Sequence, residues 1–375
     1  MQFELGEEQQ QLRSGLDRLF AQTNDLSART ATVRAEPGWR ADLWQRLARD
    51  LGVLAVGLPE TVGGFGGGID QLVTMEAAGR ALLPEPLAET VFQCAPLLAR
   101  SGAVHRPLAQ GVIAGDVRLA MALGEAGLRD ALAGVAMPAA RSGEGWLLSG
   151  EKLVVIAAPW ATHLLVAART AGQAGDAHGL SLFVVPVDVP GLALHTYRTL
   201  DERRAADVSF DQVAVGAEAL VGPEGGALPL LEEWRDRAIA AMCAEASGLL
   251  ERLLDDTVAY ARQREQFGQP IGSFQALQHR MVDMHLQLEL VRSAALLACQ
   301  SLDGDAVERA RAASAAKVTL AQACRFIGQN AVQIHGGMGM TDELAIGHYF
   351  KRATVIEHSF GSENWHLARR AGLGG

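Results

Sequence analysis

Two short segments in the C-terminal third of the chain carry residues that can bind a phosphate. The first reads Arg264-Glu-Gln-Phe267-Gly-Gln-Pro and places a guanidinium at the end of a predicted helix. The second reads Gln333-Ile-His-Gly336-Gly337-Met-Gly, where glycines let backbone N–H groups approach an anion without a Cβ in the way. A guanidinium can bind two phosphate oxygens at once. The pair therefore predicts a site for a pyrophosphate.

Two amphipathic segments, residues 273–301 and 305–330, separate these patches. Apolar residues recur in them at helical spacing, so we expect a helical hairpin between the guanidinium and the glycines. Taken alone, a basic helix end is more often a solvated C-terminus, and a glycine cluster is more often a tight turn. The two together at this separation favour a site that holds a pyrophosphate from two sides.

The composition limits the classes of function. A chain of 375 residues, 49% of them hydrophobic, can bury two or three cores. Its formal charge of −10 and its lack of Lys/Arg-rich runs argue against nucleic acid or a membrane as a partner. The four cysteines have no Cys-x-x-Cys spacing, which predicts neither a metal site nor disulfides. With no secretory leader pattern and no long apolar run, we expect a soluble, cytoplasmic protein.

Secondary-structure patterns divide the chain into three predicted domains. Helical spacing of apolar residues predicts an N-terminal α-helical domain over 1–115, with helices that include 7–20 and 88–100. Short β-prone runs between Gly, Pro and Asp turns predict a middle β domain over 116–221. The pattern is helical again over 222–375 and predicts a bundle of four long helices.

The residue patterns of the two patches, together with the order of an α, a β and an α domain along the chain, resemble the acyl-CoA dehydrogenase family. The resemblance covers essentially the whole chain. It implies an α+β fold with an N-terminal helical domain, a middle β-barrel or sandwich domain and a C-terminal four-helix bundle. It also implies FAD as cofactor, an acyl-CoA substrate and a role in fatty acid metabolism. An electron-transfer flavoprotein as acceptor and a homo- or hetero-oligomer built as a dimer of dimers, hence a tetramer, follow from the same resemblance.

The position of the catalytic base departs from the family pattern. In the family a Glu in a Tyr-Glu-Gly-Thr segment removes the pro-α proton of the acyl thioester. Counting from Gln333 places that segment on Ser359-Phe360-Gly361-Ser362. The base position is therefore Phe360, whose phenyl ring accepts no proton. The resemblance also places Ser362 among the residues that contact the cofactor.

The flavin half of the site departs as well. The family's Leu-Thr-Glu-Pro strand end, whose Thr contacts the flavin, is matched by Leu123-Gly124-Glu-Ala. Its Lys-x-Trp-Ile-Thr-Asn strand becomes Lys-Leu-Val154-Val-Ile156-Ala, so the Trp that packs on the ring is Val154 and the Thr donor is Ile156. Backbone N–H contacts to the flavin would survive these changes, so we expect a weakened flavin half.

The residues that this chain lacks and those that it keeps predict a cofactor site shared between two different chains. In the family one subunit supplies flavin contacts and the Glu, while its neighbour holds the ADP end of FAD. This chain keeps the neighbour's residues, namely Arg264, Phe267, Gln275, Gln333, Gly336 and Gly337. The hypothesis is a non-catalytic small subunit that completes the FAD site of a Glu-bearing partner. The pattern is similar to small subunits of pimeloyl-CoA and steroid side-chain dehydrogenases.

Other interpretations remain open. Glu357, one helical turn before Phe360, and Asp236, near a second family location for the base, are weak surrogate bases, and either would make the protein a self-sufficient homo-oligomeric dehydrogenase. A flavin-dependent monooxygenase or oxidase on the same fold would need no base, and a purely structural subunit would need no flavin. His335 is expected to be a local hydrogen-bonding residue, and Lys317 a surface residue.

Overall fold

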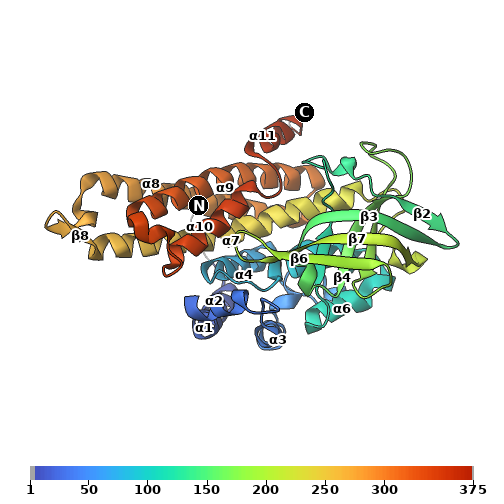
Figure 1. The fold of residues 1–375 in the computed structure, drawn as a ribbon, viewed down its shortest axis with the longest axis horizontal. Helices are drawn as coiled ribbons and strands as arrows, with labels where there is room; N and C mark the ends of the chain where they lie inside the picture. The colour runs from blue at the N-terminus through green and yellow to red at the C-terminus, as the bar shows by residue number, and fades with distance from the viewer. Residues whose placement is uncertain (1–4, 374–375) are drawn as a thin grey trace. The chain divides into compact units, whose positions relative to one another are not determined.

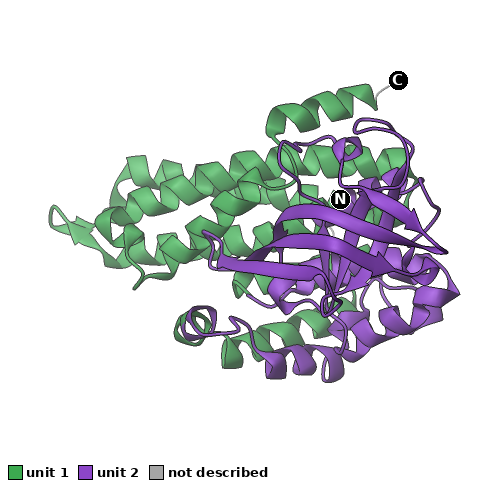
Figure 2. Cartoon of the chain, turned by 45° about the vertical axis from the view of Figure 1, so that its right-hand side comes forward, with its two compact units in different colours: residues 1–30, 68–83, 239–375 green, residues 31–67, 84–238 purple. Residues whose placement is uncertain are grey.

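The structure is a computed structural model that describes residues 5–373, and its internal contacts divide the chain into two units (Figures 1 and 2). The first unit draws on residues 1–30, 68–83 and 239–375, and the second on residues 31–67 and 84–238. These two units are defined by contacts within the chain and do not test the bounds of the three domains, 1–115, 116–221 and 222–375, which stay a prediction. The predicted α+β fold, with helices on both sides of a β region in the sequence, is confirmed.

The helices lie before and after the β region, as the apolar spacing predicts. Their bounds are α1 (Glu7–Thr23), α2 (Leu26–Arg34), α3 (Ala41–Arg49), α4 (Gly68–Arg80), α5 (Ala95–Arg100), α6 (Arg106–Ala114), α7 (Leu228–Gln263), α8 (Gln275–Gln300), α9 (Ala306–His335), α10 (Ala345–His358) and α11 (Glu363–Gly372). The segment predicted as one helix over 88–100 differs, because its first part, Ala88–Cys94, is a π-helix that leads into α5.

The β region forms two sheets. One has the order β1-β4-β5 and the other the order β2-β3-β7-β6. The strands are β1 (Leu119–Ala122), β2 (Ala139–Ser142), β3 (Gly145–Ile156), β4 (His163–Arg169), β5 (Leu180–Pro186), β6 (Leu192–Arg198) and β7 (Arg204–Val215). The β-prone runs of the sequence, at 147–148, 153–156, 163–167, 180–187, 192–196 and 207–210, predicted β3 to β7 but neither β1 nor β2. All four residues of β1 are buried, so it shows no alternation of apolar and polar residues to detect.

One apolar core joins the inner faces of these sheets. Trp146 and Leu148 of β3 belong to the same buried cluster as Leu164 of β4 and Phe183 of β5. The rings of Trp146 and Phe183 meet edge to face, with their centroids 5.2 Å apart. The middle region is therefore a β sandwich, held by side chains that alternate inward from both sheets.

In the first unit, α8 and α9 form the predicted helical hairpin between the two patches. Asp305 ends the connection between them, because its carboxylate accepts hydrogen bonds from the backbone N–H groups of Val307 and Glu308 and so caps α9. A two-residue hairpin, β8 (Glu265–Gln266) and β9 (Gln269–Pro270), connects α7 to α8. No helix within residues 5–373 is both long and apolar enough to span a membrane.

Candidate functional site

The first patch lies on the hairpin between α7 and α8. Phe267 and Gly268 form its turn, with φ angles of 56° and 77°, so both residues are left-handed. Such turns suit two-residue hairpins but normally use Asn and Gly. A left-handed backbone costs an L-residue about 1–2 kcal/mol, and the Phe267 ring is 93% exposed. A strained and uncovered aromatic ring at a predicted site residue is a feature that binding by another molecule would explain.

Arg264 has a fixed backbone and an exposed side chain. Its N–H donates to the Tyr260 carbonyl over 2.8 Å, and its carbonyl accepts from the Ile271 N–H over 2.8 Å. Within residues 5–373 its guanidinium makes no ion pair, whereas Arg252 on the preceding helix α7 is held by Asp256 at 2.9 Å. The Arg264 guanidinium is therefore open to solvent, and its role in binding the cofactor stays a prediction. Gln275, the first residue of α8, is exposed as well.

The second patch ends α9. Gly336 has a φ of 60°, which glycine adopts without strain, and it leads into a 3-10 turn over Gly336–Met340. A Cβ added at Gly336 or Gly337 would meet no atom within 4 Å. Packing within the chain therefore does not require a glycine at 337, and its backbone is open to an approaching group. Gln333 is exposed beside this open backbone, and the role of these residues in holding FAD stays a prediction.

A stacked ring pair holds the two patches near each other. The rings of Tyr260, on the last turn of α7, and His335, at the end of α9, lie 4.2 Å apart at 26°. His335 is buried, and its Nδ1–H donates to the Ala331 carbonyl over 2.8 Å. Burial lowers the pKa of His335, which keeps the ring neutral. The expectation that His335 is a local hydrogen-bonding residue is confirmed, and the structure brings both patches to one end of the α7 and α9 helices.

The turn after α10 carries the position of the family's base. Phe360 has a φ of 58°, and its carbonyl accepts a 2.8 Å hydrogen bond from Nε2–H of His366, a buried residue. Ser362 is the N-cap of α11, and its hydroxyl oxygen accepts from the Trp365 N–H over 3.2 Å. The turn therefore has a defined backbone conformation at Phe360, and the match of Phe360 to the family's base position stays a prediction. The cofactor role of Ser362 stays a prediction.

Glu357, the nearest surrogate base, is held in an ion pair. Nε and Nη2 of Arg325 lie 2.8 and 2.6 Å from its Oε1, and its side chain is 9% exposed. Lys317 donates from Nζ to the Glu357 backbone carbonyl over 2.7 Å. The prediction that Lys317 is a surface residue is wrong: it is fully buried, because α9 packs against α10 and the ammonium satisfies a carbonyl at the C-terminal end of α10.

The second unit holds the residues matched to the flavin half. Gly124 lies against β3, where its carbonyl accepts from the Leu153 N–H over 2.8 Å. A Cβ at Gly124 would come within 2.6 Å of the Leu153 carbonyl oxygen. Nζ of the buried Lys152 contacts Glu125 at 2.5 Å and the Leu123 carbonyl at 3.4 Å. The Leu123-Gly124 segment is thus fixed on β3 by its backbone and by one ion pair, without a threonine.

A bulge in β3 exposes the position of the missing tryptophan. Val154 has a φ of 53° and is 58% exposed, at a register shift between Lys152 and Val155. Its N–H donates to Asp207 over 2.9 Å, and the Tyr197 hydroxyl donates to the same carboxylate oxygen over 2.9 Å. Burial and this hydrogen bond raise the pKa of Tyr197 to about 12.

Sequence reasoning missed these contacts, because Asp207 accepts from the backbone N–H of Val154, which the bulge exposes, and Tyr197 donates to Asp207. Ile156, which replaces the family's Thr, is half-buried and pairs with Ala205 of β7. Asp236, the other surrogate base, is buried on α7 in the second unit and is 1% exposed.

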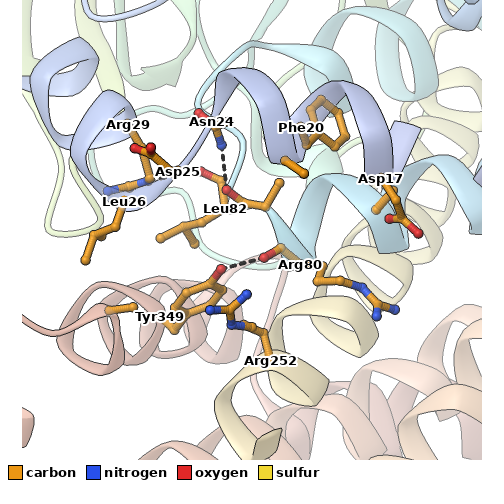
Figure 3. A pocket seen from close by; sticks show the side chains of 14 residues that line it. Asp17, Phe20, Asn24, Asp25, Leu26, Arg29, Arg80, Leu82, Arg252 and Tyr349 are labelled. Carbon is orange, nitrogen blue, oxygen red and sulfur yellow. Dashed lines mark hydrogen bonds between the residues drawn. The ribbon is translucent and has the colours of Figure 1, made fainter. Parts of the chain in front are cut away.

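A cavity of about 380 Å³ in the first unit lies among α1, α2, α4, α7 and α10 (Figure 3). Its arginines already have partners, since Arg80 contacts Glu251 and Arg252 contacts Asp256. Nε of Arg29, which also lines the cavity, donates to the Leu82 carbonyl over 3.0 Å. The Tyr349 hydroxyl donates to the Arg80 carbonyl over 2.5 Å, and burial raises the Tyr349 pKa to about 12. None of the predicted site residues lines this cavity, so it is separate from the candidate site.

Comparisons with known proteins agree with these features. Models of the N-terminal, middle and C-terminal domains of acyl-CoA dehydrogenases match residues 6–103, 120–213 and 237–371. The chain is 30% identical over 349 residues to the acyl-CoA dehydrogenase IpdE2 of Mycobacterium tuberculosis, covering 92% of this chain and 91% of IpdE2.

Two solved structures extend the similarity. A variant of the steroid ACAD Tcur3481-Tcur3483 is 32% identical with a TM-score of 0.87, covering 99% of this chain and 98% of that one. The ChsE4-ChsE5 complex of Mycobacterium tuberculosis is 28% identical with a TM-score of 0.87 and the same coverage. With all three domain models matched in order, and with relatives of this identity spanning nearly the whole chain, the protein belongs to the acyl-CoA dehydrogenase family, whose members bind FAD.

Proposed function

We propose that this chain is the subunit of a heteromeric acyl-CoA dehydrogenase that lacks the catalytic glutamate and completes the FAD site of a Glu-bearing partner. The observation that carries the proposal is the contrast between two parts of the first unit. Phe360 stands at the base position, whereas Arg264, Gly336 and Gly337 present an unpaired cation and open backbone to the outside.

The missing base is the first line of support. The α-proton of an acyl thioester is weakly acidic, so its removal needs a carboxylate with a pKa raised toward the working pH. Phe360 offers no such group. Glu357 would have to leave its ion pair with Arg325 and its place near the buried Lys317 before it could accept a proton. Dehydrogenation of the acyl group therefore depends on a carboxylate from the partner.

The cofactor contacts are the second line of support. Arg264 and the Gly336-Gly337 backbone would hold the pyrophosphate of FAD, with Gln333 and Gln275 beside it, and the exposed Phe267 would pack on the cofactor. Bound FAD supplies the acceptor for the hydride that leaves the β-carbon. The chain's own contribution is to bind and orient the ADP end, where a guanidinium and backbone N–H groups complement the negative charge.

The known relatives support a two-chain assembly. ChsE4-ChsE5 is a complex of two named proteins, and Tcur3481-Tcur3483 is likewise designated by two. In the same proposal the complex is a cytoplasmic tetramer, a dimer of dimers, acting on an acyl-CoA of fatty acid or steroid side-chain type, and it passes electrons to an electron-transfer flavoprotein.

The test replaces Arg264 by Ala in the complex co-purified with a Glu-bearing partner. Loss of a charged hydrogen bond costs about 1.5–3 kcal/mol, which is about tenfold or more in FAD affinity. Arg262→Ala is the matched control, since Arg262 is an exposed arginine on the same helix end that makes no ion pair within residues 5–373. Flavin absorbance per complex should fall for Arg264→Ala and stay unchanged for Arg262→Ala. Equal flavin content in both variants would leave only a structural role for the chain.

A further inference from the structure

The cavity in the first unit has both apolar and hydrogen-bonding walls (Figure 3). Phe20 and Leu82 line it and are buried, at 4% and 5% exposed. In Figure 3, Phe20 comes from the upper helix, α1, whereas Tyr349 and Arg252 come from the helices below, α10 and α7. The volume of about 380 Å³ lies in the range of pockets that hold small molecules. Walls of both kinds suit a ligand with an apolar part and a polar part.

Hydrogen bonds within the chain fix the wall at the end of α4. Nδ2 of Asn24 donates to the Ala81 carbonyl over 2.6 Å, and the Tyr349 hydroxyl donates to the Arg80 carbonyl over 2.5 Å. These donors come from the connection between α1 and α2 and from α10, so elements far apart in the sequence hold the wall. The carbonyl groups at this helix end therefore have donors without any ligand.

Two arginines that line the cavity keep donors without a partner. Nε of Arg252 donates to both carboxylate oxygens of Asp256, at 3.0 and 2.9 Å, but within residues 5–373 its two Nη atoms have no hydrogen-bond partner. Nε of Arg80 is buried and has no partner in that range either, while its Nη2 contacts Glu251. Buried polar atoms without partners are rare in proteins and indicate a water, an ion or a ligand.

The charges around the cavity limit the charge of such a ligand. Its charged lining residues are Arg29, Arg80, Arg252, Asp17 and Asp25. Burial raises the Tyr349 pKa to about 12, and the charges of all three arginines act against that rise, so the arginines lie near its phenol. The two aspartates are exposed, and the carboxylates of Glu251 and Asp256 pair with the arginines. These four carboxylates would repel a second negative charge more than a single one.

The Arg252 side chain is 49% exposed, so a ligand can reach it from solvent. We propose that the cavity binds a small organic monocarboxylate with a short aliphatic chain. Its carboxylate accepts hydrogen bonds from Arg252 and Arg80, and its chain packs against Phe20 and Leu82. None of the predicted cofactor residues lines the cavity, so the inference goes beyond the proposed function and does not depend on it.

The experiment is a calorimetric titration of the full-length chain with three probes. Octanoate has both the carboxylate and the chain, octanamide has the chain without the charge, and inorganic phosphate has charge without a chain. Octanoate should bind with one site per chain. Octanamide and phosphate should each bind at least about tenfold more weakly, because the first loses charged hydrogen bonds and the second loses apolar burial.

Three variants place the bound octanoate. Arg252→Gln removes the guanidinium and should weaken binding about tenfold or more. Ala345→Leu enlarges a lining side chain at the start of α10 and should block binding while it leaves both arginines in place. Arg262→Gln is the matched control, because Arg262 is an exposed arginine on the same helix, α7, and does not line the cavity. It should bind octanoate as wild type does.

Absence of saturable octanoate binding by wild type would overturn the inference. Octanamide or phosphate binding as tightly as octanoate would overturn it too, since the site would then not require both parts of the ligand. Unchanged binding by Arg252→Gln and Ala345→Leu, each shown by circular dichroism to be folded, would place octanoate elsewhere. The titration needs neither FAD nor a partner, so its failure is distinguishable from a failure of the proposed function.

Discussion

Three residues matched to cofactor or base positions, Val154, Phe267 and Phe360, share an unusual backbone. Each has a φ between 53° and 58°, although none is glycine or asparagine. The residue patterns of the sequence picked out these positions but could not predict their φ angles. Those angles depend on the bulge at Val154, on the hairpin at Phe267 and on the hydrogen bonds around Phe360. Four other non-glycine residues, Leu82, Ala157, Glu202 and Gln212, also have positive φ angles, so a positive φ by itself does not identify a site.

At the residue scale, Phe267→Asn should raise stability while it weakens cofactor binding. Asn tolerates the left-handed turn, and the 93% exposed ring gives up only its edge-to-face contact with Phe274, whose centroid is 6.2 Å away. Relief of strain should therefore add up to about 1 kcal/mol to the free energy of unfolding. Thermal unfolding of the isolated chain measures the gain, and flavin absorbance of the complex measures the loss. A variant that is no more stable than wild type would show that the turn is unstrained.

At the scale of elements, helical periodicity predicted α7, α8 and α9 and the connection between the two patches. It did not predict the contacts that α9 makes with Glu357 and Glu363, on either side of the 359–362 turn. The partners of Lys317, Gln322 and Arg325 lie 32 to 41 residues further along the chain, on α10 and α11. Such contacts follow from how helices pack. The Ala-rich sequence around Lys317 is compatible with an exposed helix and also with a buried helix in which the ammonium has a hydrogen-bond partner.

Lys317→Met tests the hydrogen bond that joins α9 to the end of α10. The variant keeps an unbranched side chain that is one atom shorter, but it leaves the buried Glu357 carbonyl without its donor, which should cost about 1–3 kcal/mol of unfolding free energy. Lys351→Met is the control, because the Lys351 side chain is 35% exposed and lies 3.6 Å from Asp342 at the surface. Chemical denaturation compares the two. Equal midpoints would mean that the buried ammonium adds nothing to the α9 and α10 contact.

At the scale of the whole molecule, the order of helical and β segments and two short motifs were enough to predict the fold and the family. They left the assembly open, because an intersubunit site divides its residues between two chains and one sequence shows only one share. In the proposed function, the open glycines and the unpaired Arg264 are this chain's share of such a site. These residues, together with Phe360, support the proposal that this chain binds a cofactor for the reaction of its partner.

The most direct measurement is native mass spectrometry, with acyl-CoA dehydrogenase turnover, of this chain purified alone and co-purified with a Glu-bearing family member from the same source. The account predicts that the chain alone carries little FAD and no activity. It predicts that the co-purified assembly contains both chains in equal number, binds FAD and turns over. An assembly of this chain alone that carries one FAD per subunit and dehydrogenates an acyl-CoA would contradict it.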